Sequence, residues 1–284
     1  MSLTFPRAAS PRPAFPALSA LLAEGRAREP LLWGAAIVFL LAMLPTAVAF
    51  ALDDRTLNGI SVWWKPLKFQ VSIALFLATL AWLTGALAPA ARQSRFLRWF
   101  AIVSVALLTY EIAYMMIQSA RGVGSHFNTA TPLEGLLFTL MGAAALVFTA
   151  FPAALGVAIA RNPAPGLAPA LRLAVVSGLV ITAGLGIATG AALGINGGHW
   201  VGAPATDLGG LPVLGWSREG GDLRVAHFFA LHALQILPLF GWLVARRRPE
   251  ATGVVWIVST AYAAFTLYVF AEALLGRPFL PIIG

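Results

Sequence analysis

The stretch "GGDLRVAHFFALHALQILPLFGWL", residues 220–243, combines an apolar run of membrane-spanning length with ionisable side chains in its first half. An α-helix needs about 20 mainly apolar residues to cross a bilayer. An ionisable group that faces lipid in such a span costs at least about 2.5–3.5 kcal/mol, so these groups usually face a bundle interior or a wet cavity. The stretch therefore predicts one helix of a larger bundle. Its polar members are Asp222, Arg224, His227, His232 and Gln235.

The composition of the whole chain is that of a membrane protein. Of its 284 residues 59% are hydrophobic and only 11% are charged, against about 25% charged residues in a soluble domain. We therefore expect an all-α integral membrane protein, a bundle of seven transmembrane helices. The predicted spans are about 31–52, 64–88, 99–119, 133–160, 171–193, 224–245 and 252–276.

Residues 1–30 differ from the rest of the chain and are predicted to form a cytoplasmic tail. They are polar, contain several Arg and Pro residues, and lack the apolar core of a signal peptide. A short interfacial helix is expected near Leu18–Leu22. Residues 31–284 are predicted to form a single transmembrane domain.

The arginines predict the orientation, because short cytoplasmic loops are enriched in Lys and Arg. Twelve of the 19 basic residues fall in the tail and in alternate loops. The N-terminus is therefore predicted to be cytoplasmic and the C-terminus extracytoplasmic, in a bacterial-type inner membrane. A nucleic-acid partner is not expected, since no soluble basic domain is present. The twelve residues are Arg7, Arg12, Arg26, Arg28, Arg92, Arg95, Arg98, Arg161, Arg172, Arg246, Arg247 and Arg248.

The connection between the fifth and sixth spans, residues 194–223, is a long glycine-rich loop. Nine glycines lie between positions 194 and 222. A loop of this length without periodicity is more often functional or disordered than a plain connector. Just before it, Gly186, Gly190 and Gly194 recur every four residues, a spacing that lets a neighbouring helix approach closely.

Polar residues form stripes on several spans, all toward the predicted outer side. At 100° per residue, Lys65, Lys68, Ser72 and Thr79 share an arc of about 60°. In the third span a stripe runs from Tyr110 and Glu111 to Arg121, and the seventh span adds Tyr268 and Glu272. We therefore predict an outward-facing polar chamber lined by the second, third, sixth and seventh spans. The glycine-rich loop and the turn at 122–128 would cover it.

A buried acid, imidazoles and cations together suggest a membrane-embedded enzyme that acts on an anionic or polar lipid-like substrate. Acid–base chemistry is assigned to Glu111, His232 and His227, because carboxylates and imidazoles are the usual proton-transfer groups. Besides membrane lipids, a lipid-like or anionic small molecule is the expected partner. The predicted substrate-binding residues are Lys65, Lys68, Tyr114, Gln118, Arg121, His126, Asn128, Asp222, Arg224, Gln235 and Glu272.

Other interpretations stay open at this point. The two lysines could extend to the lipid head groups, and Glu111 could belong to a structural ion pair with Lys68 or Arg121. A proton-coupled transporter would also need polar groups inside the membrane. A redox protein with haem b or a divalent metal is the third possibility, although the five-residue spacing in "HFFALH" is poor for chelation. Without cysteine, a thiolate-bound cofactor is excluded; the candidate metal ligands are His126, His199, His227 and His232.

Overall fold

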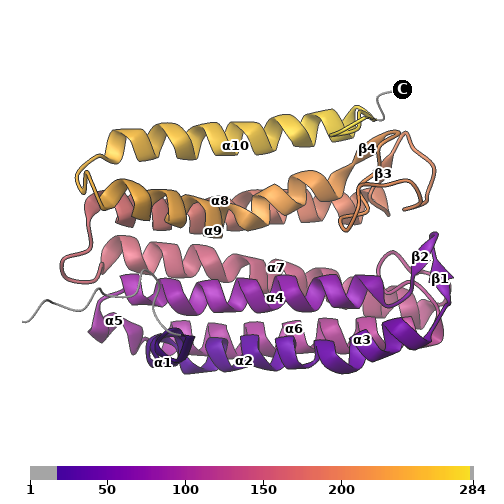
Figure 1. Cartoon of the computed structure of the whole chain (residues 1–284), viewed down its shortest axis with the longest axis horizontal. Helices are drawn as coiled ribbons and strands as arrows, with labels where there is room; N and C mark the ends of the chain where they lie inside the picture. Colours follow the sequence, from indigo (N-terminus) through magenta and orange to yellow (C-terminus); the bar gives the residue numbers. More distant parts are fainter. Residues whose placement is uncertain (1–17, 282–284) are drawn as a thin grey trace, which may run out of the picture.

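The computed structural model describes residues 18–281 (Figure 1), so the first part of the predicted tail lies outside the described residues. Seven of its helical segments are long and apolar enough to cross a membrane, which confirms the seven-helix, all-α bundle. The helices are α1 (Leu18–Arg28), α2 (Pro30–Leu41), α3 (Met43–Leu52), α4 (Trp64–Leu83) with the 3-10 turn η1 (Thr84–Ala86), α5 (Pro89–Arg92), α6 (Arg95–Arg121), α7 (Pro132–Arg161), α8 (Pro169–Asn196), α9 (Leu223–Ala245) and α10 (Thr252–Leu274).

The first span consists of two helices, α2 and α3, that meet at Ala42. Pro45 has no N–H to donate to the carbonyl four residues earlier, so the helical ladder is interrupted here. The carbonyl that loses its donor is that of Leu41; the next carbonyl, that of Ala42, accepts side-chain hydrogen bonds from Thr46 Oγ1 at 3.0 Å and from Gln70 Nε2 of α4 at 3.2 Å. The break in the first span is therefore fastened to α4.

The helices form two groups that lie side by side in Figure 1. The N-terminal group comprises α2, α3, α4, α6 and α7, and the C-terminal group comprises α8, α9 and α10. Helices α7 and α8 contact each other and join the groups, whereas α10 packs against α8 and α9.

Small residues bring α8 and α9 close together. A Cβ atom added to Gly178 would lie 2.8 Å from the carbonyl oxygen of Ala233, and one added to Gly186 would lie 3.0 Å from Leu231. The predicted glycine ridge is thus confirmed at Gly186 and also at Gly190, whose added Cβ would lie 3.2 Å from His227. Gly194 has no neighbour within 4 Å, so the ridge ends before it.

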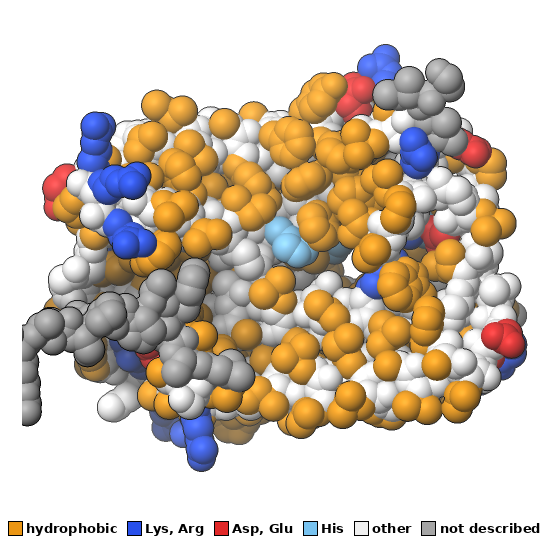
Figure 2. Space-filling model, viewed as in Figure 1, with side chains coloured by type: hydrophobic (Ala, Val, Ile, Leu, Met, Phe, Trp, Pro, Cys, Tyr) orange, Lys and Arg blue, Asp and Glu red, His pale blue; other side chains and the backbone are white. Residues whose placement is uncertain are grey.

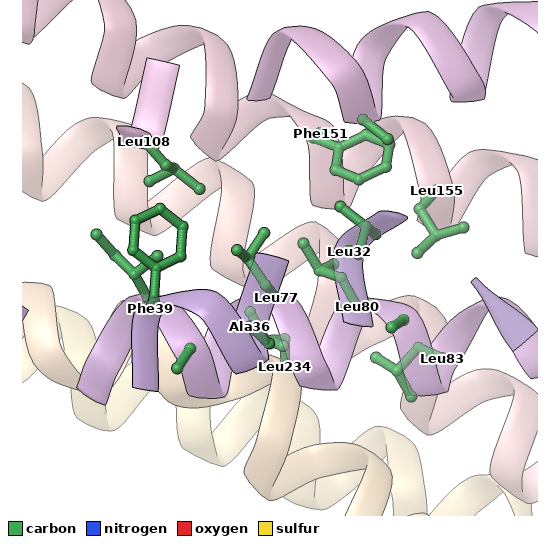
Figure 3. Packing of buried hydrophobic residues seen from close by; sticks show 14 of the residues in the cluster. Leu32, Ala36, Phe39, Leu77, Leu80, Leu83, Leu108, Phe151, Leu155 and Leu234 are labelled. Atoms are coloured by element: carbon green, nitrogen blue, oxygen red, sulfur yellow. The ribbon is translucent and has the colours of Figure 1, made fainter. Parts of the chain in front are cut away.

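The largest apolar core lies inside the N-terminal group (Figure 3). Leu77, Leu80 and Leu108 are almost fully buried there, and Leu234 of α9 reaches into the same cluster. Lipid tails are as apolar as leucine, so such contacts stabilise a membrane bundle by close packing rather than by escape from water. Because Val175 and Leu179 of α8 belong to the same cluster, the core joins the C-terminal group to the N-terminal group.

The two ends of the bundle differ in structure. At one end, called here the loop end, lie two short antiparallel pairs: β1 (Thr56–Leu57) with β2 (Ile60–Ser61), and β3 (Trp200–Val201) with β4 (Gly221–Asp222). The opposite end, called here the arginine end, carries α1, α5 and the α7–α8 and α9–α10 turns (Figure 1). The expected interfacial stretch near Leu18–Leu22 is helical, as the start of α1. Which end faces the cytoplasm stays a prediction.

Candidate functional site

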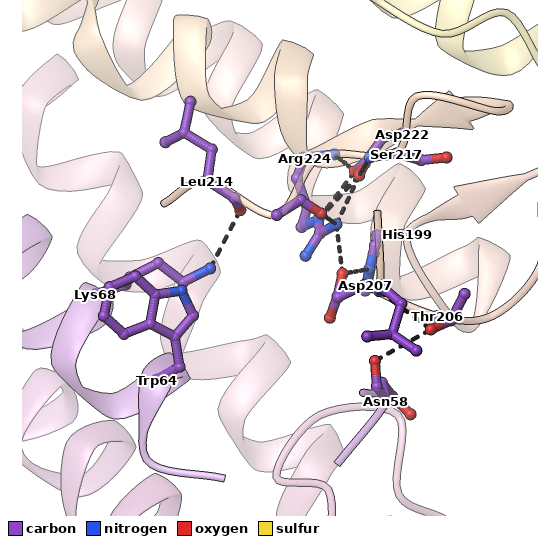
Figure 4. Close-up of polar contacts among 12 residues, drawn as sticks. Asn58, Trp64, Lys68, His199, Thr206, Asp207, Leu214, Ser217, Asp222 and Arg224 are labelled. Carbon is purple, nitrogen blue, oxygen red and sulfur yellow. Dashed lines mark hydrogen bonds and ion pairs between the residues drawn. The ribbon is translucent and has the colours of Figure 1, made fainter. Parts of the chain in front are cut away.

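The long loop of residues 197–222 lies between the two helix groups at the loop end (Figure 4). The loop contacts the N-terminal group at two places. The amide N–H of Asp207 donates to the carbonyl of Asn58, in the β1–β2 turn, at 2.9 Å. Trp64 Nε1 donates to the carbonyl of Val213 and Lys68 Nζ donates to that of Leu214, both at 3.2 Å. The pairing of β3 with β4 brings the ends of the loop together. The loop therefore bridges α4 and the start of α9.

Arg224, near the start of α9, is the centre of a compact ionic cluster. Its guanidinium lies 2.7 Å from Asp222 and 2.8 Å from Asp207, and it donates to the carbonyl of Gly215 at 2.6 Å. The Asp222 side chain, which is 0% exposed, also accepts the amide N–H of Ser217 at 2.9 Å and caps α9 through the amide of Arg224. Two carboxylates thus neutralise this half-buried cation.

His199 joins the cluster through Asp207. Its Nε2 lies 3.3 Å from Asp207 Oδ1, and its ring packs against Trp200. Burial lowers the pKa of His199, because it penalises the charged form. Burial raises the pKa of Asp207, but the hydrogen bonds and charges of His199 and Arg224 lower it by more, so the pKa is below its ordinary value. At neutral pH a neutral His199 therefore donates Nε2–H to an ionised Asp207.

Lys65 and Lys68, one helical turn apart at the start of α4, lack such partners. Neither forms an ion pair with a carboxylate in the part of the chain that the structure describes. Lys68 binds the Leu214 carbonyl, and Lys65 Nζ lies 5.7 Å from the centre of the Phe69 ring. A Cβ added to Gly215 would be 3.9 Å from both Lys68 Nζ and Asp207 Oδ1. These lysines therefore border the ionic cluster without joining it.

Glu111 of α6 forms a second centre with the turn at 122–128. It is buried, with 5% exposure; its Oε1 lies 3.7 Å from His126 Nε2, and its Oε2 has no hydrogen-bond partner among the described residues. The His126 ring packs 5.7 Å from the Phe69 ring, centre to centre. The pKa of His126 is well below its usual range, first because of burial and second because of the nearby Lys65 ammonium. Lys65 thus borders this centre as well.

The other predicted polar residues of this region hold the turn in place. Gln118 Nε2 donates to Tyr114 at 3.1 Å and to the Gly124 carbonyl at 3.2 Å, and Arg121 donates to Gln118 Oε1 at 2.6 Å. Asn128 Nδ2 donates to the same Gly124 carbonyl at 3.1 Å. The geometry gives these four side chains a positioning role for the turn that carries His126.

His227, predicted to take part in acid–base chemistry, faces α8. His227 Nδ1 lies 3.0 Å from Thr189 Oγ1, and its ring packs against Gly190 of α8. The side chain therefore fills the interface between α8 and α9. A helical wheel gives the angle between two side chains on α9, but not the helix that each one faces.

Gln235 lies on the side of α9 that approaches α4, and His232 lies one turn before it on the same helix. His232 Nδ1 lies 2.8 Å from the carbonyl of Phe228. Since a carbonyl only accepts, the neutral imidazole donates from Nδ1 and keeps Nε2 as an acceptor. Gln235 Nε2 donates to Thr79 Oγ1 of α4 at 3.3 Å. Figure 2 shows this face hollowed between the two groups, with a histidine and basic side chains at the hollow.

The polar residues of the seventh span lie at a pocket of their own. Glu272 pairs with Arg277 at 3.1 Å, and Tyr268 is 61% exposed. Both line a separate pocket of about 120 Å³, which Asp222 and Phe279 also border. Helix α10 packs mainly against α8 and α9. That this span lines the same chamber as α4 and α6 stays a prediction.

The structure does not bring the four histidines together. Within residues 18–281 no three His, Asp or Glu side chains are arranged to hold a metal ion. His126 contacts Glu111, His199 contacts Asp207, and the two histidines of α9 contact Thr189 and the Phe228 carbonyl.

Two carboxylates of these clusters were missed by the sequence reasoning. Glu134 pairs with Arg121 at 2.9 Å, and Asp207 joins His199 to Arg224. A sequence pattern could have identified Glu134 at a helix start, because Thr131 and Glu134 have the spacing of a capping box. Thr131 Oγ1 does accept the Glu134 amide N–H at 3.2 Å. Asp207 lies in an aperiodic loop, where no sequence pattern indicates its partners.

No family model matches the chain, and no match was found among curated proteins or among solved structures.

Proposed function

We propose that this multi-pass membrane protein binds the anionic head group of a lipid-like amphiphile at Lys65 and Lys68 and acts on it as an enzyme. The observation that carries the proposal is the contrast in pairing at the loop end. Arg224 has two carboxylates, whereas the two half-buried lysines beside it have none among the described residues. Removing a cation from water, even in part, is unfavourable without a counter-charge, and an anionic ligand would supply one.

The chemistry is assigned to Glu111 and His126, next to Lys65. A carboxylate with a free oxygen and a neutral imidazole form a pair that can take up and release a proton during a reaction. His232 Nε2, on the opposite helix group, is a second available base. Tyr114, Gln118, Arg121 and Asn128 would act through the turn and not on the substrate.

The groove between α4 and α9 is the proposed place of the apolar tail. Head-group cations lie at its loop end, and the buried apolar core that contains Leu77 of α4 and Leu234 of α9 lies farther from that end. An amphiphile fits this order of polar and apolar surface. We propose that the loop end faces the extracytoplasmic side, as the positions of the arginines predict.

Binding is tested with dodecyl phosphate and, as the cationic counterpart, dodecyltrimethylammonium, on the full chain in neutral detergent micelles. Replacing both lysines with glutamine should weaken dodecyl phosphate binding at least about tenfold, or about 1.4 kcal/mol, as measured by quenching of tryptophan fluorescence. Arg247→Gln, an exposed arginine at the other end, is the matched control. Equal binding of the two amphiphiles, or equal loss in the control, contradicts the proposal.

Turnover is tested separately from binding. Glu111→Gln keeps the shape of the side chain but removes its proton affinity, so it should retain dodecyl phosphate binding. It should also abolish conversion of a membrane lipid extract, with products followed by mass spectrometry. A wild-type protein that binds the amphiphile and converts nothing would contradict the enzymatic part alone.

One observation favours a second candidate, a proton-coupled transporter. The Thr79–Gln235 contact lies about 22 Å along α4 from Trp64, at 1.5 Å per residue, which is deeper than an entry site for a head group requires. A transporter would acidify or alkalinise liposomes when the amphiphile is added, and Glu111→Gln would abolish that signal. Conversion without proton movement would exclude it.

A further inference from the structure

A pocket of about 460 Å³ lies at the arginine end, far from the lysines. It is formed between the start of α6, with Phe96 and Leu97, and the end of α7, with Val157 and Arg161. Its volume lies within the range of about 300–1,000 Å³ that is usual for small-molecule sites. Phe96 is 66% exposed, so this wall lies on the outer surface of the bundle, where a membrane helix meets lipid.

The rim of this pocket is fastened by backbone hydrogen bonds between segments distant in sequence. The amide of Ala88 donates to the carbonyl of Asn162 at 2.9 Å, and the amide of Ala164 donates to that of Ala86 at 2.8 Å. Leu87 and Pro163 form a bridge between the same two segments. The backbone of this edge of the pocket, next to Asn162, is therefore held in place by contacts between the two segments.

The arginines around the pocket are not equivalent. Arg92 donates to the carbonyls of Leu87 and Gly85, both at 2.9 Å, and Arg172 donates to the carbonyl of Ala160. Arg161 lines the pocket itself, yet it forms no ion pair or hydrogen bond through its side chain with any residue between 18 and 281. Its guanidinium is therefore available to a ligand, while its neighbours hold the corner of the fold.

We infer that this pocket binds an anionic glycerophospholipid of the adjoining leaflet. A guanidinium matches phosphate oxygens in a two-bond geometry, and basic pockets between membrane helices are known to bind anionic head groups. The acyl chains would lie along Phe96, Leu97 and Val157, below the head group. The site is independent of the proposed amphiphile site, because it lies at the opposite end of the bundle.

The test is native mass spectrometry of the full chain in dodecyl maltoside with added phosphatidylglycerol or, separately, phosphatidylcholine. We expect the wild type to retain one phosphatidylglycerol preferentially and Arg161→Gln to retain it about tenfold less well. The matched control Arg248→Gln, an exposed arginine at the same end, should bind like the wild type.

A second variant keeps the arginine and fills the pocket. Ala154→Leu adds bulk to its apolar wall and should lower phosphatidylglycerol retention while the melting temperature stays near that of the wild type. The double variant with both lysines replaced by glutamine should retain the lipid as the wild type does. Equal retention of the two phospholipids, equal loss in Arg248→Gln, or full retention in Arg161→Gln and Ala154→Leu would overturn the inference.

Discussion

Arg224 and Lys68 are neighbouring cations at the loop end, but their surroundings are opposite. Arg224 is held by two carboxylates and a backbone carbonyl, and it joins α9 to the long loop. Lys68 has a single carbonyl as partner. Removing one partner of a largely buried ion pair is strongly destabilising, since it leaves an uncompensated charge. A cation with little pairing contributes less to folding and is available to bind an anion. Four predictions follow from this difference.

The largest effect is expected for Asp222→Ala. This change removes a buried partner of Arg224 and the N-cap of α9 together. The loss should be on the order of 3–5 kcal/mol, the range for a broken buried ion pair, as measured by unfolding in detergent micelles. Glu219→Ala, at an exposed position of the same loop, should change stability by less than about 0.5 kcal/mol. Similar unfolding of both variants would mean that the Arg224 cluster is not a scaffold.

The second prediction concerns pH. The folded-state pKa values of His199 and Asp207 are both below their ordinary values, so the unfolded chain binds more protons than the folded one. Stability should therefore decrease as the pH falls below about 6.5, where an unfolded histidine titrates, and further as Asp207 protonates. His126 gives a slope of the same sign.

The pH test is therefore the difference between the wild type and His199→Gln in the unfolding midpoint from pH 7.5 to pH 5. His199→Gln stays neutral throughout and should show a shallower decrease. Parallel curves for the two proteins would show that the titration of His199 does not cause the loss of stability at low pH.

Lys68→Gln should have a smaller effect on stability, because it removes one hydrogen bond to the Leu214 carbonyl. We expect a loss of about 0.5–1.5 kcal/mol, the usual net value of one hydrogen bond, from the same unfolding measurement. A loss as large as that of Asp222→Ala would remove the distinction between the two cations, and with it the main support for an anion site.

The smallest effect is expected at Val213, whose carbonyl accepts the Trp64 indole. Val213 has a φ of +66°, in the left-handed region, which a β-branched residue rarely adopts. Val213→Gly should remove strain of about 1–2 kcal/mol, partly offset by the greater freedom of glycine in the unfolded chain, for a net gain below about 1 kcal/mol. Val201→Gly, at a strand position without a positive φ, should instead destabilise the protein. If both variants destabilise the protein equally, the positive φ of Val213 does not cost measurable stability.

The sequence predicted the helices well and the site only in part. Helical periodicity places Thr79 with the lysines and Gln235 with Arg224, and the structure does bring these two faces together at the Thr79–Gln235 contact. The same periodicity could not assign His227, because the angle between side chains on one helix does not identify the neighbouring helix. The surroundings of Glu272 could not be predicted for the same reason, because periodicity does not show that α10 packs mainly against α8 and α9.

By itself, the sequence determined the seven apolar helices, since a bilayer requires about 20 apolar residues for each span and the chain provides seven such runs. It also determined which residues share a helix face. Only the tertiary structure decided which charges are paired. Asp207 reaches Arg224 from a loop without periodicity, and Lys65 and Lys68 have no such carboxylate among the described residues. Pairing depends on distances between segments far apart in the chain, and no local pattern of residues encodes those distances.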